Sequence, residues 1–100
     1  MQWLWTWGGK SFGYRDNDNL FTHFGKHIGK FSANEIYDVR GKYLGELIND
    51  DRLISDTRKR SFLKHPFAPY AGSGYAKYAD YAGYAIYAGH EDFPSPETFK

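Results

Sequence analysis

Four lysines could bind anions, because they occupy matching places in a repeated sequence. Three of them follow a glycine at sixteen-residue intervals and the fourth falls in a weaker copy: Lys10, Lys26, Lys42 and Lys59. Ammonium groups gathered on one rim attract phosphate or carboxylate, and near an anionic bilayer each adds about 1 kcal/mol of attraction. The alternative is that a lysine after each turn only keeps the turn soluble and protects a strand end.

Aromatic side chains and further cations fall near the same turns. Trp7 and His23 hold equivalent places just before the first two turns, and Arg40, Arg58 and Arg60 flank the later lysines. The alternative for the tryptophans is a core role, since aromatic rings bury large areas. We therefore predict a ligand-binding set composed of Lys10, Lys26, Lys42, Lys59, Arg40, Arg58, Trp7 and His23.

Signatures of catalysis or metal binding are weak in this chain. His23 and His27 have the spacing that holds zinc on a helix, but Gly25 is expected to turn the chain between them. The acidic run 16–19 lacks the glycine and glutamate that a calcium loop requires, and there is no cysteine. No nucleophile–base pair emerges, so we expect a non-enzymatic protein without metal or cofactor.

The elements that must position these residues follow from the repeat. Residues 4–19, 20–35 and 36–51 align without gaps, with glycine in common at Gly9, Gly25 and Gly41. A fourth, degraded copy begins at Leu53. Each copy predicts a strand, a two-residue type I′ turn such as Gly8-Gly9, and a second strand. The expected fold is all-β: a small antiparallel up-and-down barrel of four hairpins with pseudo-four-fold symmetry.

The turn also predicts which residues face each other across each hairpin. An aromatic–aliphatic pair is expected in every copy, and a large aliphatic side chain opposite a glycine, where strands commonly bend. The expected pairs are Trp5–Phe12, Phe21–Ile28 and Tyr37–Leu44, and Leu4–Gly13, Leu20–Gly29 and Ile36–Gly45.

The C-terminal part has a different composition. Five Tyr-Ala-x triplets occupy residues 75–89, among glycines and prolines. On an α-helix this period drifts by about 60° per triplet, whereas on polyproline II all five tyrosines would share one ridge. Alanine favours a helix over 75–87 and the glycines oppose it; a flexible low-complexity tail is the other alternative. We divide the chain into a hairpin-repeat domain, 1–65, and a Tyr/Ala-rich extension, 66–100, that is helical or flexible.

Composition narrows the class of protein. One hundred residues form one small core, and a net charge of +1 gives no global field for nucleic acid. Residues 1–10 lack the pattern of a signal peptide, and no apolar run approaches the length of a membrane span. We expect a cytoplasmic protein, with peripheral membrane association as an alternative.

The repeated Gly-Lys-x-apolar-Gly segments resemble the bacterial 4-fold β-flower domains. The resemblance covers roughly residues 1–64 and rests on 9–13, 25–29 and 41–45, with the Ile36-Tyr37-Asp38 lead-in. It implies a shallow, square barrel of four hairpins, similar in architecture to Tubby-like barrels, which bind phosphoinositides and membranes. The weak fourth copy and the Tyr-Ala tail depart from that family's pattern.

Two functional hypotheses follow. The first is a non-enzymatic module that binds an anionic small ligand or phospholipid headgroup at the lysine rim, with aromatic residues lining a central channel. The second is a structural or self-assembly module in which the Tyr-Ala tail mediates homo-oligomerisation. No nucleic-acid partner is expected.

Overall fold

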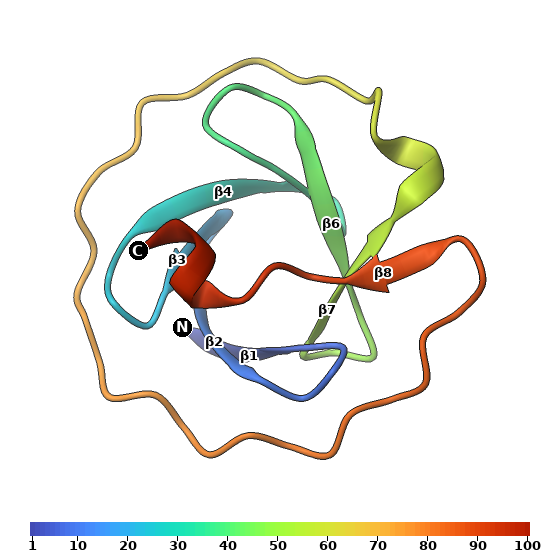
Figure 1. Cartoon of the computed structure of the whole chain (residues 1–100). Coiled ribbons are helices and arrows are strands. Elements are labelled where there is room, and N and C mark those ends of the chain that lie inside the picture. Colours follow the sequence, from blue (N-terminus) through green and yellow to red (C-terminus); the bar gives the residue numbers. More distant parts are fainter.

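The computed structural model describes all 100 residues and is all-β, with seven strands closed into a barrel and one further strand (Figure 1). Neighbours in the sequence pair in antiparallel order, and the ring closes through a parallel pairing of the first and seventh strands. The strands are β1 (Gln2–Thr6), β2 (Ser11–Asp16), β3 (Asn19–Thr22), β4 (His27–Ser32), β5 (Glu35–Tyr37), β6 (Tyr43–Ile48), β7 (Arg52–Asp56) and β8 (His90–Asp92). Two 3-10 turns complete the list, η1 (Thr57–Lys59) and η2 (Pro96–Phe99).

The hairpin predicted within residues 53–64 does not form. Asp56 caps η1 by accepting a hydrogen bond from the Arg58 backbone at 3.0 Å, and the chain then leaves the barrel. The edge of β7 that does not pair with β6 instead has two partners. Arg52 and Leu53 pair with β1, and residues 54–56 pair with β8. The physical reason is that this copy lacks the tip glycine that turns the other three.

The turns at the three hairpin tips contain one more residue than the predicted type I′ turns. Gly9 has a φ of 92°, whereas Gly8 is not in the left-handed region, and the Gly9 N–H donates to the Thr6 carbonyl at 2.9 Å. This is a three-residue loop whose last residue is left-handed. Only one position then requires glycine, which explains why Phe24 and Arg40 are tolerated where the first copy has Gly8.

The predicted glycine pairings are confirmed and the aromatic–aliphatic ones are wrong. Leu4, Leu20 and Ile36 lie opposite their glycines, and the register then shifts at the next residue in all three hairpins. The bulge places Trp5 opposite Ser11, Phe21 opposite His27 and Tyr37 opposite Tyr43. In each hairpin a side chain stabilises the bulge by accepting a hydrogen bond from the N–H of the repeat lysine. Lys10 donates to Thr6 Oγ1, Lys26 to Thr22 Oγ1 and Lys42 to Asp38 Oδ1.

Because of the bulge, residues that were expected to share one face of the sheet lie on opposite faces. The barrel interior is filled by side chains. Leu4 and Phe12 point inward, so the expected aromatic-lined channel does not exist. Phe93, which follows β8, enters the interior and meets Phe12 edge-on with ring centroids 5.2 Å apart. The core consists of Leu4, Phe12, Leu20, Ile28, Phe31, Ile36, Leu47, Leu53 and Phe93.

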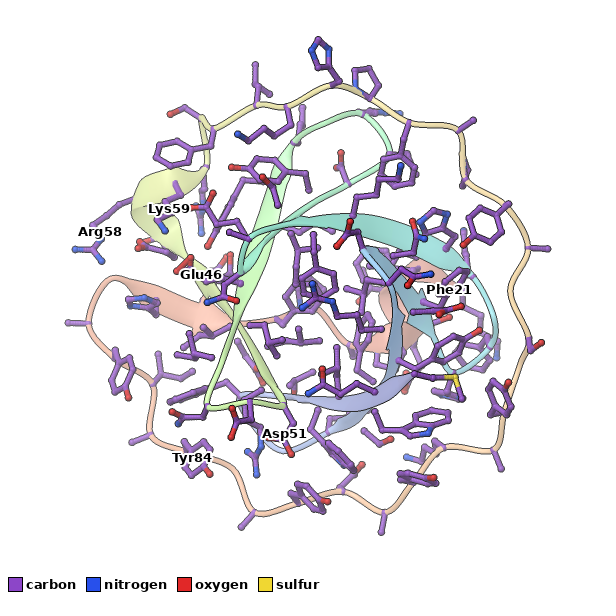
Figure 2. All side chains as sticks on the ribbon, turned by 180° about the vertical axis from the view of Figure 1, so that it is seen from behind. Phe21, Glu46, Asp51, Arg58, Lys59 and Tyr84 are labelled. Atoms are coloured by element: carbon purple, nitrogen blue, oxygen red, sulfur yellow. The ribbon has the colours of Figure 1, made fainter.

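Residues 64–87, which we call the strap, contain no helix, so the helix over 75–87 was a wrong prediction. The strap circles the barrel as an extended belt and returns to β7 through β8 (Figure 1). All five of its triplet tyrosines contact a tryptophan of β1 or of the turn that follows it. Figure 2 shows aromatic rings between strap and barrel, with Tyr84 among them. This one-sided arrangement is what a three-residue period produces on an extended chain.

Candidate ligand-binding cleft

The four repeat lysines divide into two that are ion-paired and two that are free. Lys10 Nζ lies 3.2 Å from Glu97 Oε1, and Lys59 Nζ lies 2.9 Å from Glu35 Oε2 and 2.8 Å from Glu46 Oε2. Lys26 and Lys42 form no ion pair with a carboxylate. The structure therefore does not gather four equivalent free lysines on one rim.

The other predicted site residues are also distributed unequally. Arg58 makes a two-point contact with Asp56, at 2.9 and 3.0 Å, whereas Arg40 has no carboxylate partner. Trp7 is only 1% exposed, because Tyr84 and Tyr87 of the strap cover it. His23 is half-buried against Phe24, with ring centroids 4.1 Å apart.

Cations without a carboxylate partner gather in one sector of the molecule. Lys26, Lys30, Arg40 and Lys42 belong to the second and third hairpins, which are neighbours in the ring (Figure 1). Two more cations lie over aromatic rings nearby, Lys64 over Tyr37 and Lys100 over Phe24. An anion approaching this sector meets cations whose side chains form no ion pair, although the Asp38 carboxylate lies at the third tip and accepts from the backbone N–H groups of Arg40 and Lys42.

A cleft of about 600 Å³ opens in this sector between the tip of the second hairpin and the strap. Lys26 stands at its edge, and Val39 of the third hairpin contributes to the wall. Apart from Lys26 and His27 the lining is mostly apolar or backbone, which suits a ligand that combines a charged group with an apolar part. The lining residues are Phe24, Gly25, Lys26, His27, Val39, Pro69, Tyr70, Ala71 and Gly72.

His27 is the buried polar group of this cleft, and it was not among the predicted site residues. Its side chain is enclosed by the rings of Phe21, Phe67 and Tyr70, all with centroids 4.8 Å away. Burial lowers the pKa of the imidazole, and nearby Lys30 acts in the same direction, while the backbone of Gly29 partly opposes them. Nδ1 accepts a hydrogen bond from the Tyr70 N–H at 3.3 Å, so the neutral ring carries its proton on Nε2.

The Nε2 atom of His27 is buried and has no partner at hydrogen-bond geometry within the protein; the backbone of Gly29 is close enough to raise the imidazole pKa but forms no such bond. A buried donor without a partner costs free energy, and natural structures contain few of them. His27 lines both the large cleft and an adjoining pocket of about 200 Å³ that Lys26 and Asp38 also border. Because Nε2 is fully buried, an anion or a bridging water would reach this proton only if the covering Phe67 and Tyr70 rings of the strap moved aside. The signal in the sequence was a histidine between Lys26 and an inward-facing Ile28, a position read only as half of a zinc pattern.

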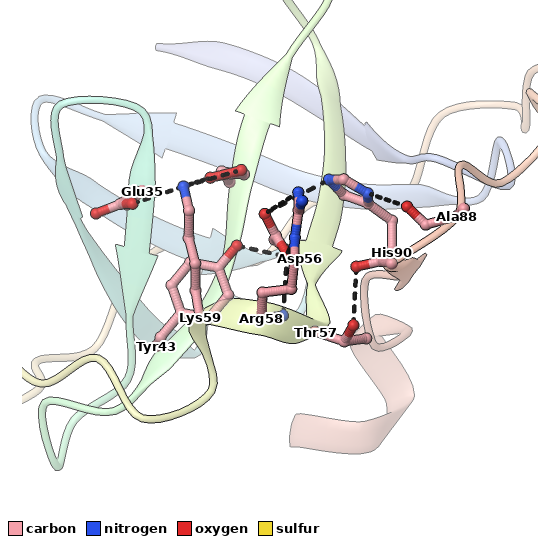
Figure 3. A network of polar contacts seen from close by, with 10 residues as sticks. Glu35, Tyr43, Asp56, Thr57, Arg58, Lys59, Ala88 and His90 are labelled. Carbon is pink, nitrogen blue, oxygen red and sulfur yellow. Dashed lines mark hydrogen bonds and ion pairs between the residues drawn. The ribbon is translucent and has the colours of Figure 1, made fainter.

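A second cluster of ionisable groups lies away from this cleft, where η1 meets β8 (Figure 3). Glu46, Asp56 and His90 bring potential metal-ligating atoms within 4.8 Å of one another. Lys59 and Arg58 already neutralise the two carboxylates, and the Arg58 contact lowers the pKa of Asp56 to about 2. Burial raises the pKa of Tyr43, whose hydroxyl accepts from the Asp56 N–H, to about 12. We interpret this cluster as an ion-pair network that fastens η1 and β8 to the barrel.

Comparison of the chain with protein-family models, curated proteins and solved structures found no match. No helix of the structure has the length and apolar character needed to cross a membrane.

Proposed function

We propose that this protein is a non-enzymatic binding module for an anionic small ligand or phospholipid headgroup. The site we assign is the cleft between the tip of the second hairpin and the strap rather than a symmetric lysine rim. The observation that carries the proposal is the buried, unpartnered Nε2 of His27 beside a lysine that has no carboxylate partner. Two donors of this kind can share one anionic group, because a charged donor attracts it and a desolvated neutral donor orients it.

The surroundings of the cleft favour the same class of ligand. Lys42 and Arg40 extend the positive charge onto the neighbouring tip, and no carboxylate forms an ion pair with any cation of this sector. A phospholipid headgroup and a free phosphate ester or carboxylate offer the same chemistry here, so the proposal names the anionic group and leaves its source to experiment.

The test compares two double variants with equal loss of charge. Lys26→Gln/Lys42→Gln removes the free lysines, and Lys10→Gln/Lys77→Gln removes two lysines that have carboxylate partners. Each protein is co-sedimented with phosphatidylserine-containing and with phosphatidylcholine vesicles, and titrated with inorganic phosphate and benzoate by NMR.

We expect anion binding by the wild type that weakens at high salt, is lost in the first variant and is kept in the second. Binding to anionic vesicles alone would identify a surface headgroup as the source. Equal loss in both variants would reduce the effect to net charge and contradict the cleft, as would absence of binding to every probe.

We also infer that the barrel follows a four-hairpin, pseudo-four-fold plan like that of β-flower domains. Support comes from the shared tip geometry, in which Gly9, Gly25 and Gly41 all have φ between 85° and 92° and the same bulge follows. Strands β7 and β8 would then stand in the place of the fourth hairpin. A solved structure of a β-flower domain with a different tip loop and no bulge would remove this support.

Self-association is the second candidate function. The five strap tyrosines are each 42–52% exposed and form a continuous aromatic belt around one side of the molecule. Sedimentation velocity over a concentration series at low and high salt distinguishes the candidates, because tyrosine-mediated association survives salt that abolishes anion binding. Deletion of residues 70–100 would not be a clean test, because it would remove Phe93 from the core.

A further inference from the structure

The strap contacts the hairpin tips in the same way three times. At each tip one strap N–H donates to the carbonyl of the tip glycine, and the N–H three residues later donates to the carbonyl two residues before that glycine. The pairs of donors are Lys64 and Phe67 at the third tip, Gly72 and Tyr75 at the second, and Tyr81 and Tyr84 at the first. The distances lie between 2.7 and 3.1 Å.

This spacing is that of a bound peptide rather than of an added strand. A strand would pair through alternate residues, whereas donors three residues apart face the same way on a polyproline-type chain. The indole N–H groups of Trp5 and Trp7 contact the strap with the same three-residue period. They donate at 2.9 and 2.8 Å to the carbonyls of Ala79 and Ala85, which are six residues, or two periods, apart.

The aromatic contacts also have this period. Each of the three tryptophans contacts two consecutive triplet tyrosines: Trp3 meets Tyr75 and Tyr78, Trp5 meets Tyr78 and Tyr81, and Trp7 meets Tyr84 and Tyr87. The closest pair is stacked, with the Trp5 and Tyr81 centroids 4.0 Å apart. Arg52 adds a cation over the Tyr84 ring at 4.3 Å. Aromatic grooves that read extended, proline-like segments are an established mode of peptide recognition.

We propose that this outer surface, formed by Trp3, Trp5, Trp7, Arg52 and the carbonyls of the first tip, is a peptide-binding surface. Its partner is an extended peptide with an aromatic residue at every third position, and the strap is the occupant built into the chain. The proposal concerns a different surface from the anion cleft and does not depend on it. Because the strap is tethered, it competes at an effective concentration in the millimolar range, so a free peptide binds well only when the strap is weakened.

The test uses the full chain and a fluorescent peptide with the sequence of residues 74–88. The strap is weakened by Tyr78→Ala/Tyr81→Ala/Tyr84→Ala, and a control peptide of the same composition has its tyrosines at irregular spacings. By fluorescence anisotropy we expect the variant to bind the regular peptide at least about tenfold more tightly than the irregular one, and at least about tenfold more tightly than the wild type does. Equal binding of the two peptides overturns the proposal, and so does absence of binding by a variant whose NMR spectrum shows a folded barrel.

If the triple variant does not fold, the wild type provides the measurement. Excess unlabelled regular peptide is added to the ¹⁵N-labelled protein, and the indole signals of Trp5 and Trp7 are followed. Saturable shifts with the regular peptide alone support displacement of the strap. No shift at millimolar peptide, or the same shift with the irregular peptide, overturns the proposal.

Discussion

The first and second hairpins have the same backbone and different side chains at the places that matter. At the first tip, Trp7 is sealed beneath the strap and Lys10 is paired with Glu97. At the second, the equivalent residues are the half-buried His23 and the unpaired Lys26. The strap above the first tip consists of Tyr-Ala triplets, whereas above the second it has Pro69 and Gly72 and leaves a cleft. The shared turn and bulge therefore fix where the strap binds, and the side chains decide whether the space beneath it is closed or open.

Trp5→Ala should have the largest effect, because it removes the side chain that holds the strap over the first hairpin. The indole stacks on Tyr81 and donates to Ala79, and truncating a buried tryptophan typically costs about 3–5 kcal/mol. Chemical denaturation measures the global loss. Hydrogen exchange should show faster opening at the amides of Tyr81 and Tyr84 than at those of Gly72 and Tyr75, which bind the second tip. Uniform acceleration at all four amides would contradict independent binding at the two tips.

Gly9→Ala should cost less, but more than Gly8→Ala. A left-handed non-glycine residue costs about 1–3 kcal/mol, and a Cβ on Gly9 would also overlap the Tyr81 carbonyl. A Cβ on Gly8 meets only the end of the Asp92 side chain, which can move. The expected result is a substantial loss in denaturant midpoint for the first variant and a small change for the second. Equal effects would mean that the two glycines have equivalent roles, as a type I′ turn requires.

Much of the barrel could be predicted from the sequence because the repeat is local information. Sixteen-residue spacing places the hairpins, and glycine opposite Leu4, Leu20 and Ile36 sets their pairing. The bulge could not be predicted, because it depends on a hydrogen bond that a backbone N–H donates to the Thr6 or Asp38 side chain, and the alternation of residue types does not register that bond. The consequence was that residues assigned to one face, such as Trp5 and Phe12, lie on opposite faces.

The strap and the cleft depend on contacts between distant parts of the chain. Strand β8 joins residues 90–92 to β7, and Phe93 completes a core that the repeat alone leaves unfilled. A tyrosine every third residue was compatible with helix or polyproline II, and only the tryptophans of β1 select the extended form. Lys26 could be named from its repeat position, whereas His27 becomes notable only when Tyr70, forty-three residues later, covers it.

Lys59→Gln and Lys26→Gln should differ in their cost to stability, because Lys59 is ion-paired and Lys26 is not. Both costs should be smaller than that of Trp5→Ala. Removing the Lys59 ammonium leaves Glu35 and Glu46 close together without a cation, and raises the pKa of Glu35 from its lowered value. Because the pair is partly exposed, the cost should be up to about 1 kcal/mol. Lys26→Gln should change stability by less than about 0.5 kcal/mol. Denaturation at neutral pH measures both, and a loss for Lys26→Gln as large as that for Lys59→Gln would contradict its being free.

The smallest expected effect, and the most specific to the second hairpin, is a pH dependence due to His27. Its folded-state pKa is lowered mainly by burial, whereas the unfolded histidine titrates near 6.5. The unfolded chain therefore binds more protons below that pH, so stability is fully present above about pH 6.5 and declines as the pH falls toward the folded pKa. Protonation also removes the Nδ1 acceptor for the Tyr70 N–H, which should loosen the strap at the cleft first.

His27→Gln should flatten the stability profile between pH 7.5 and 5.5, because glutamine does not titrate. His90→Gln is the matched control: that ring lies 3.8 Å from Asp56 in the ion-pair network and does not contact the cleft. Denaturant midpoints across this range, with hydrogen exchange at Tyr70 and Gly72, provide the measurement. A slope that persists in His27→Gln and disappears in His90→Gln would assign the dependence to the network. In that case the first and second hairpins would differ in shape and charge but not in their response to pH.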